Sequence, residues 1–134
     1  MKHDTPPASM IPTMKGFSPA FAALGLDAAL LTTLEALGYE EPTPIQREAI
    51  PPLLAERDLL GRAATGTGKT AAFTLPLLQR MAHSARQQHP FALILVPTRE
   101  LAIQVCEAVE RYGKEYRISI LAVYGGQAIR PQLL

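Results

Sequence analysis

The chain has 134 residues, of which 48% are hydrophobic and 19% are charged. This is enough apolar material for the core of one globular domain, but too little chain for a complete two-domain enzyme. Thirteen Lys and Arg residues against twelve Asp and Glu residues leave a net charge of +1, so bulk charge indicates neither a nucleic-acid partner nor a membrane surface. Any site for a polyanion must therefore be local.

The cysteine count and the apolar runs bear on the compartment. A single cysteine, Cys106, excludes an internal disulfide and fits a reducing environment. Apolar runs such as 91–96 are far shorter than the roughly 18 residues that cross a bilayer, and the N-terminus lacks the apolar core of a signal peptide. We therefore expect a cytoplasmic protein without a membrane segment.

The N-terminal part is predicted to be a leader followed by a first helix. Residues 1–16 are rich in Met and Pro and show no periodicity, which predicts a flexible leader before one domain over 17–134. Asp27 is a good helix N-cap, and Leu26 before it suits a hydrophobic staple. Gly38 then has the position just after a helix C-terminus, so we expect the first helix between Asp27 and Gly38.

A second helix is predicted to begin at Thr43, with Pro44 at the first helical position, where the missing N–H is no loss. Two consecutive prolines, Pro51 and Pro52, are predicted to interrupt it, and Pro76 is predicted to kink the later helix that contains it.

Strand and helix patterns alternate over the rest of the chain. Residues 58–63, 91–96 and 118–124 have strand length and apolar character, and helices are expected over 69–81 and 99–113. The order β-α-β-α-β predicts an α/β fold built on a parallel sheet with helices on both faces. The continuous apolar run at 91–96 is typical of a central strand covered on both sides.

A glycine-rich stretch, residues 63–70, lies between a predicted strand and a predicted helix, where a phosphate-binding loop belongs. Gly66 and Gly68 allow successive N–H groups to point inward, and the helix N-terminus adds partial positive charge for phosphates. Lys69 would bind the β and γ phosphates, and Thr70 would offer a hydroxyl to a bridging Mg²⁺. The first position of the strict motif is Ala63 instead of Gly, so an ordinary glycine-rich turn before a helix is the alternative.

Upstream, residues 38–46 admit a purely structural interpretation. Thr43 and Gln46 have the spacing of a capping box, in which the Gln side chain returns to the N–H of the cap residue. Phe21 on its own is typical of a core aromatic residue. Taken singly, neither feature indicates a binding site.

Together with the loop, however, the sequence from Phe21 to Gly126 resembles the DEAD-box family of ATP-dependent RNA helicases. Residues 38–46 resemble the Q motif of that family, with Phe21 seventeen residues before Gly38, where the family has an isolated aromatic residue. The loop is similar to motif I, in which Ala at the first position is normal. Residues 97–101 resemble motif Ia, and Gly125 with Gly126 resembles the glycine doublet.

The resemblance implies a RecA-like P-loop domain that binds ATP and Mg²⁺. It implies that Gln46 reads the adenine edge with its two-headed amide and that Phe21 stacks on the base. Lys69 and Thr70 take the catalytic roles, with Thr70 holding Mg²⁺ through ATP. The residues implied in ATP binding are Phe21, Tyr39, Pro42, Thr43, Gln46, Ala64, Thr65, Gly66, Thr67, Gly68, Lys69 and Thr70.

For the partner, the resemblance implies single-stranded or duplex RNA, contacted through its sugar-phosphate backbone. The residues implied are Pro97, Thr98, Arg99, Gly125 and Gly126. Local chemistry allows this, since Thr98 is a good N-cap and Arg99 adds a fixed charge at a helix start. The alternative is a solvated Arg beside a routine helix cap.

The D-E-A-D and S-A-T motifs of the family do not occur in the 134 residues. We therefore expect a truncated domain that binds ATP without turning it over, and self-association through an uncovered sheet edge. Two alternatives stay open: another P-loop protein, such as a nucleotide kinase or a DNA helicase, and a non-catalytic binding module.

Overall fold

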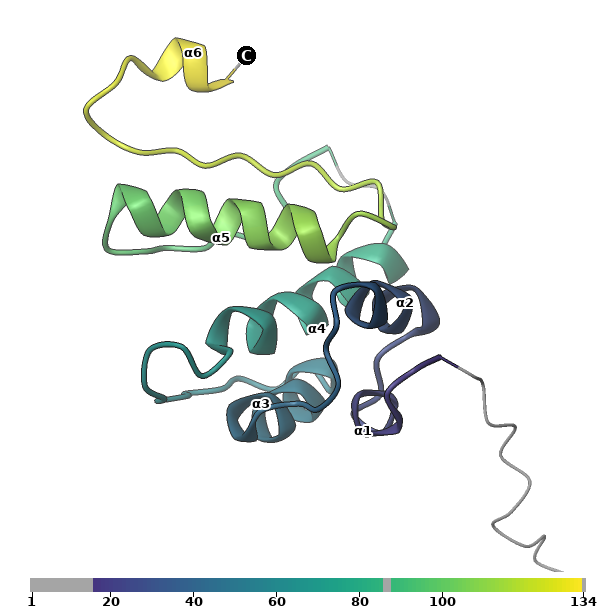
Figure 1. Ribbon diagram of the computed structural model, residues 1–134. Coiled ribbons are helices and arrows are strands. Elements are labelled where there is room, and N and C mark those ends of the chain that lie inside the picture. Colours follow the sequence, from purple (N-terminus) through teal and green to yellow (C-terminus); the bar gives the residue numbers. More distant parts are fainter. Residues whose placement is uncertain (1–15, 86–87, 134) are drawn as a thin grey trace, which may run out of the picture.

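The computed structural model describes residues 16–85 and 88–133, and within these ranges the chain forms six helices (Figure 1). They are α1 (Pro19–Ala22), α2 (Ala28–Ala36), α3 (Pro44–Leu54), α4 (Lys69–His83), α5 (Arg99–Tyr112) and α6 (Ile129–Leu133). The predicted flexible leader over 1–16 lies, except for Gly16, outside the described residues.

The predicted ends of α2 are confirmed. The Asp27 side chain accepts a hydrogen bond from the backbone N–H of Leu30 at 3.1 Å, as an N-cap should. At the other end Gly38 has a φ of +78°, and the N–H of Tyr39 donates to the carbonyl of Leu34 at 2.9 Å. A left-handed glycine at this position satisfies the last carbonyls of the helix.

The prediction that Pro51 and Pro52 interrupt the second helix is wrong, because α3 continues through both residues to Leu54. The φ of proline is compatible with a helix, and what each proline loses is one N–H donor. The carbonyls of the two prolines still accept, from Ala55 and Arg57 respectively. α4 likewise runs as one helix through Pro76.

The core lies between the helices, with α4 in the middle. α4 packs against α3 on one side and against α5 on the other, and α2 also contacts α5 (Figure 1). α5 turns one apolar side toward this core, where Val105, Ala108, Val109 and Tyr112 are buried. The side chains of Leu30, Ile50, Leu75 and Leu78 have no exposed surface at all. α4 therefore lies between α3 and α5 in this core.

The predicted parallel sheet is not confirmed. No β-strand occurs in the described ranges, and the segments 58–63, 91–96 and 118–124 form no backbone ladder with one another. A strand requires a partner that is distant in sequence, whereas an apolar pattern records only the tendency to be buried.

These segments nevertheless keep a two-sided pattern. Ile94, Val96, Ile118 and Ile120 pack against the helical core, whereas Leu93 and Leu95 are 83% and 84% exposed. One face of these segments is thus covered and the other is bare, so the expectation of helices on both faces is also not met among the described residues. None of the helices placed in the structure is long and apolar enough to cross a bilayer.

Replacing Leu75 by Ala is expected to destabilise the domain by about 2–5 kcal/mol, because the side chain lies fully buried in α4 and would leave a cavity. Urea denaturation followed by circular dichroism measures this loss. Leu60→Ala is the matched control, since Leu60 is 93% exposed and its truncation should stay within about 0.5 kcal/mol. Equal losses for the two variants would contradict the packing described.

Candidate functional site

The phosphate loop and the residues upstream meet at one side chain, Gln46. It is 1% exposed, at the third position of α3. Its Oε1 accepts from the backbone N–H of Thr43 at 3.0 Å, and its Nε2 donates to the carbonyl of Gly68 at 3.2 Å. The amide thus caps its own helix and holds the start of α4, so both predicted motifs form one unit.

Gly68 is fixed at this junction by sterics as well as by the hydrogen bond. It is the N-cap of α4 with a φ of +86°, a conformation that favours glycine. A Cβ on Gly68 would lie 2.3 Å from Nε2 of Gln46 and 3.2 Å from Oγ1 of Thr43. Thr43 Oγ1 is buried and makes no hydrogen bond of normal geometry, although the reciprocal capping arrangement with Gln46 is present. No side chain other than hydrogen fits at position 68.

The rest of the loop is more open. Thr65 and Gly66 are exposed, and Gly66 has a φ of +79° with open space on the side where a Cβ would point. Lys69 Nζ donates to the carbonyl of Ala63 at 2.7 Å, and Thr67 Oγ1 donates to the carbonyl of Ala64 at 2.6 Å. Thr70, in the first turn of α4, is half-buried. The ammonium of Lys69 is therefore hydrogen-bonded to the first residue of the loop that precedes it.

Three aromatic residues pack in a row, with a half-buried Tyr39 between Phe21 and Tyr112. Phe21 is 1% exposed and packs edge-on against Tyr39, with ring centroids 6.2 Å apart. The hydroxyl of Tyr39 lies 2.7 Å from that of Tyr112 in α5, and Pro42 nearby is buried. Burial first, and then the hydrogen bond to Tyr39, raise the pKa of Tyr112 to about 12. Phe21 and Gln46 are thus both buried against neighbouring residues, at 1% exposed each.

The two segments predicted to contact RNA are brought together at the start of α5. Thr98 is the N-cap, and its Oγ1 accepts from the N–H of Leu101 at 3.1 Å. The guanidinium of Arg99 lies over the ring of Tyr124, 5.8 Å from its centroid. Tyr124 directly precedes Gly125 and Gly126, which are exposed, as are Pro97 and Thr98. A positive charge, a helix N-terminus and a glycine turn therefore share one surface.

Sequence reasoning missed two residues of this surface, Tyr124 and Gln132. The side chain of Gln132 in α6 bonds both backbone groups of Tyr124. Only the position of Tyr124 directly before the glycines gave a hint, and nothing local in the sequence predicts a partner eight residues further on.

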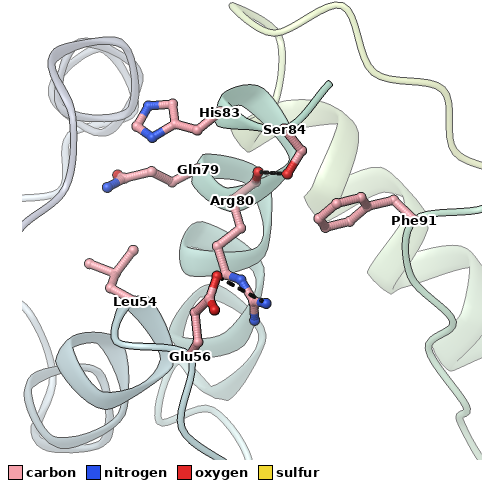
Figure 2. Close-up of a pocket in the computed structure, with 7 residues that line it drawn as sticks. All are labelled: Leu54, Glu56, Gln79, Arg80, His83, Ser84 and Phe91. Carbon is pink, nitrogen blue, oxygen red and sulfur yellow. Dashed lines mark hydrogen bonds and ion pairs between the residues drawn. The ribbon is translucent and has the colours of Figure 1, made fainter. Parts of the chain in front are cut away.

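A hollow of about 400 Å³ opens elsewhere, at the C-terminal ends of α3 and α4 (Figure 2). It contains the Arg80–Glu56 ion pair, with 3.6 Å between Nη2 and Oε1. The residues that line it are Leu54, Glu56, Gln79, Arg80, His83, Ser84 and Phe91. None of the predicted ATP or RNA residues is among them, so it is separate from the candidate site.

Comparison with known proteins places these motifs in a family. Residues 43–134 match the family model described as DEAD/DEAH box helicase. The chain is 52% identical over 121 residues to the ATP-dependent RNA helicase DeaD of Escherichia coli (strain K12), an alignment that covers 90% of this chain and 19% of the relative. It is 49% identical over 113 residues to the DEAD-box ATP-dependent RNA helicase CshA of Bacillus cereus, covering 84% of this chain and 21% of the relative. The chain thus spans about a fifth of the length of these relatives.

Two solved structures resemble the fold. An ADP-bound RNA helicase of Chaetomium thermophilum superposes with a TM-score of 0.76 at 43% identity, over 82% of this chain and 28% of that one. A DEAD box protein of Methanococcus jannaschii gives a TM-score of 0.77 at 38% identity, over 85% of this chain and 31% of that one. With the family model matching most of the chain in the same region as the loop and helix starts described above, this protein belongs to the DEAD/DEAH box helicase family.

Proposed function

We propose that these residues form the ATP-binding part, and one portion of the RNA-contacting part, of an ATP-dependent RNA helicase. The bridge from Gln46 to Gly68 carries the proposal, because it ties the base-reading motif to the phosphate loop. The names of the relatives favour RNA over DNA as the nucleic acid and give no support to a nucleotide kinase.

The loop suits the phosphates of a nucleoside triphosphate. The first N–H groups of α4 lack partners within the helix, and their dipole favours an anion. Gly66 has open space where a Cβ would point, and Nζ of Lys69 lies at the first residue of the loop, where it donates to the carbonyl of Ala63. Exchange of the Ala63 carbonyl for a phosphate oxygen would give Lys69 a charge-assisted partner.

Thr70 is the residue proposed to hold Mg²⁺, which neutralises phosphate charge when bound with ATP. Thr70 is the second residue of α4 and so directly follows the loop and Lys69. Its hydroxyl is the one side-chain oxygen that motif I assigns to the ion.

Adenine recognition is proposed for Gln46 and Phe21, with Tyr39, Pro42 and Thr43 as the surrounding wall. The Gln46 amide has a second N–H beyond the one it gives to Gly68, and its Oε1 can accept a further hydrogen bond. Thr43 Oγ1, buried without a partner, is a ready acceptor in the same place. Guanine presents the reverse donor and acceptor pattern, so this set favours ATP over GTP.

RNA binding is proposed for the surface that joins Thr98 and Arg99 to Gly125 and Gly126. N–H groups at the start of α5 and one guanidinium suit a phosphodiester backbone. A few local contacts of this kind do not need a strongly basic domain, which agrees with the net charge of +1.

ATP at about a hundred times its dissociation constant is expected to raise the free energy of unfolding by roughly 2.7 kcal/mol. Thermal or urea denaturation with Mg²⁺ and ATP, compared with Mg²⁺ and GTP, measures this gain, and GTP should give much less.

Lys69→Ala should lose most of the gain. Gln46→Glu keeps the acceptor for Thr43 N–H but cannot donate to Gly68, so it should lose the preference for ATP. Equal stabilisation by ATP and GTP in the unsubstituted chain would contradict the proposed base recognition.

The 134-residue chain is expected to show no RNA-stimulated ATP hydrolysis, because it contains no D-E-A-D motif to hold the catalytic carboxylates. A phosphate-release assay with single-stranded RNA tests this. Lys69→Ala is the blank, and release above that blank would show that other residues supply the carboxylate role.

We also propose that the isolated chain self-associates. Leu60, Leu93 and Leu95 are 93%, 83% and 84% exposed on segments whose backbone groups pair with no other segment described in the structure. Sedimentation velocity at rising concentration should show dimers or larger species. Leu93→Lys with Leu95→Lys should shift the chain toward the monomer, and a monomer at all concentrations would refute this proposal.

A further inference from the structure

The backbone just before the glycine doublet is held by a side chain and not by a strand. The N–H of Tyr124 donates to Oε1 of Gln132 at 3.0 Å, and Nε2 of Gln132 donates to the carbonyl of Tyr124 at 3.1 Å. A glutamine amide has one acceptor and a donor side by side, so it can match both groups of one residue as a neighbouring strand would. Gln132 therefore takes the place of a strand partner at Tyr124.

The doublet itself is loosely surrounded in the part of the chain that the structure describes. Apart from the adjoining residues, no atom lies within 4 Å of the place where a Cβ would stand on Gly125 or on Gly126, and Gly126 has a φ of +84°. Glycine has the largest backbone freedom to lose on ordering. Gln132 joins the two ends of this turn, Tyr124 and α6, and so restricts its path.

The hydrogen bonds between Gln132 and Tyr124 also affect the start of α5, through the ring of Tyr124. Arg99 lies over that ring, and its Nε is 3.7 Å from Oε1 of Glu100. The Arg99 side chain remains 50% exposed, so the guanidinium is positioned by both neighbours and keeps a solvent-facing side. Gln132 makes longer contacts with the carbonyls of Gln127, at 3.5 Å, and Ala128, at 3.4 Å, which tie it to the turn itself. One amide thus sets the turn, and the ring that it fixes orients Arg99.

We propose that Gln132 is a positioning residue for RNA backbone binding, acting through Tyr124 on the glycine doublet and on Arg99. It touches no RNA in this scheme. The inference rests on the RNA-binding part of the proposed function, and it adds that affinity for the backbone depends on a neutral side chain outside the matched motifs.

The test is binding of a fluorescein-labelled single-stranded oligouridylate, followed by fluorescence anisotropy at low and at rising ionic strength. Gln132→Met has the same length and no hydrogen-bonding amide, and it should weaken binding roughly three- to ten-fold by loss of the two bonds. Gln104→Met makes the same change at an exposed glutamine of α5, outside the turn, whose side chain makes no hydrogen bond in the structure, and it should bind as the unsubstituted chain does.

The salt dependence separates positioning from charge. Arg99→Ala should reduce the slope of log affinity against log salt by about 0.7, as expected for one lost phosphate contact with a single strand. Gln132→Met should leave the slope unchanged while lowering the affinity. An unchanged affinity for Gln132→Met, with normal RNA binding by the unsubstituted chain, would overturn the positioning role alone. Failure of the unsubstituted chain to bind would overturn the RNA site together with its positioning.

Amide hydrogen exchange gives a readout that does not depend on RNA. The N–H of Tyr124 should exchange faster in Gln132→Met, whereas Gln132→Glu keeps the acceptor oxygen and should retain the protection. Equal protection of the Tyr124 N–H in Gln132→Met and in the unsubstituted chain would show that Gln132 does not hold this backbone.

Discussion

The candidate site depends on one buried amide. Gln46 joins Thr43, the N-cap residue of α3, to Gly68, the N-cap residue of α4. Because the Gln46 side chain is buried, losing either hydrogen bond would leave an unpaired polar group and lower the stability of the domain. The geometry of the phosphate loop is thus set by a residue from another helix. Gly68 completes the constraint, since a larger residue would collide with that amide.

A second set of contacts connects the proposed nucleotide-binding side to the proposed RNA-binding side. Tyr39 touches Phe21 at one edge and Tyr112 at the other, and Tyr112 ends the helix whose first turn holds Thr98 and Arg99. α5 is a continuous helix between these points. The proposed binding surfaces are therefore joined by the aromatic contacts of Tyr39 and by the helix α5.

Local physical chemistry predicted the helices well and the strands poorly. Capping by Asp27 and Thr98 and termination at Gly38 depend on hydrogen bonds between residues a few positions apart. A short stretch of sequence therefore contains both the donor and the acceptor. Pro51 and Pro52 misled, because proline removes donors without forbidding helical dihedral angles. The strand predicted at 91–96 is not confirmed, because an apolar run carries no information about which strand lies beside it.

The sequence by itself determined the motifs, their order and the residue types that suit phosphate, and these sufficed for the family. Only the tertiary structure showed that Gln46 holds Gly68, that Phe21 is buried against Tyr39, and that Gln132 clamps Tyr124. The physical reason is the range of the interactions. A helix cap or a glycine turn is settled by near neighbours, whereas a buried side chain finds its partner only after distant segments have packed together.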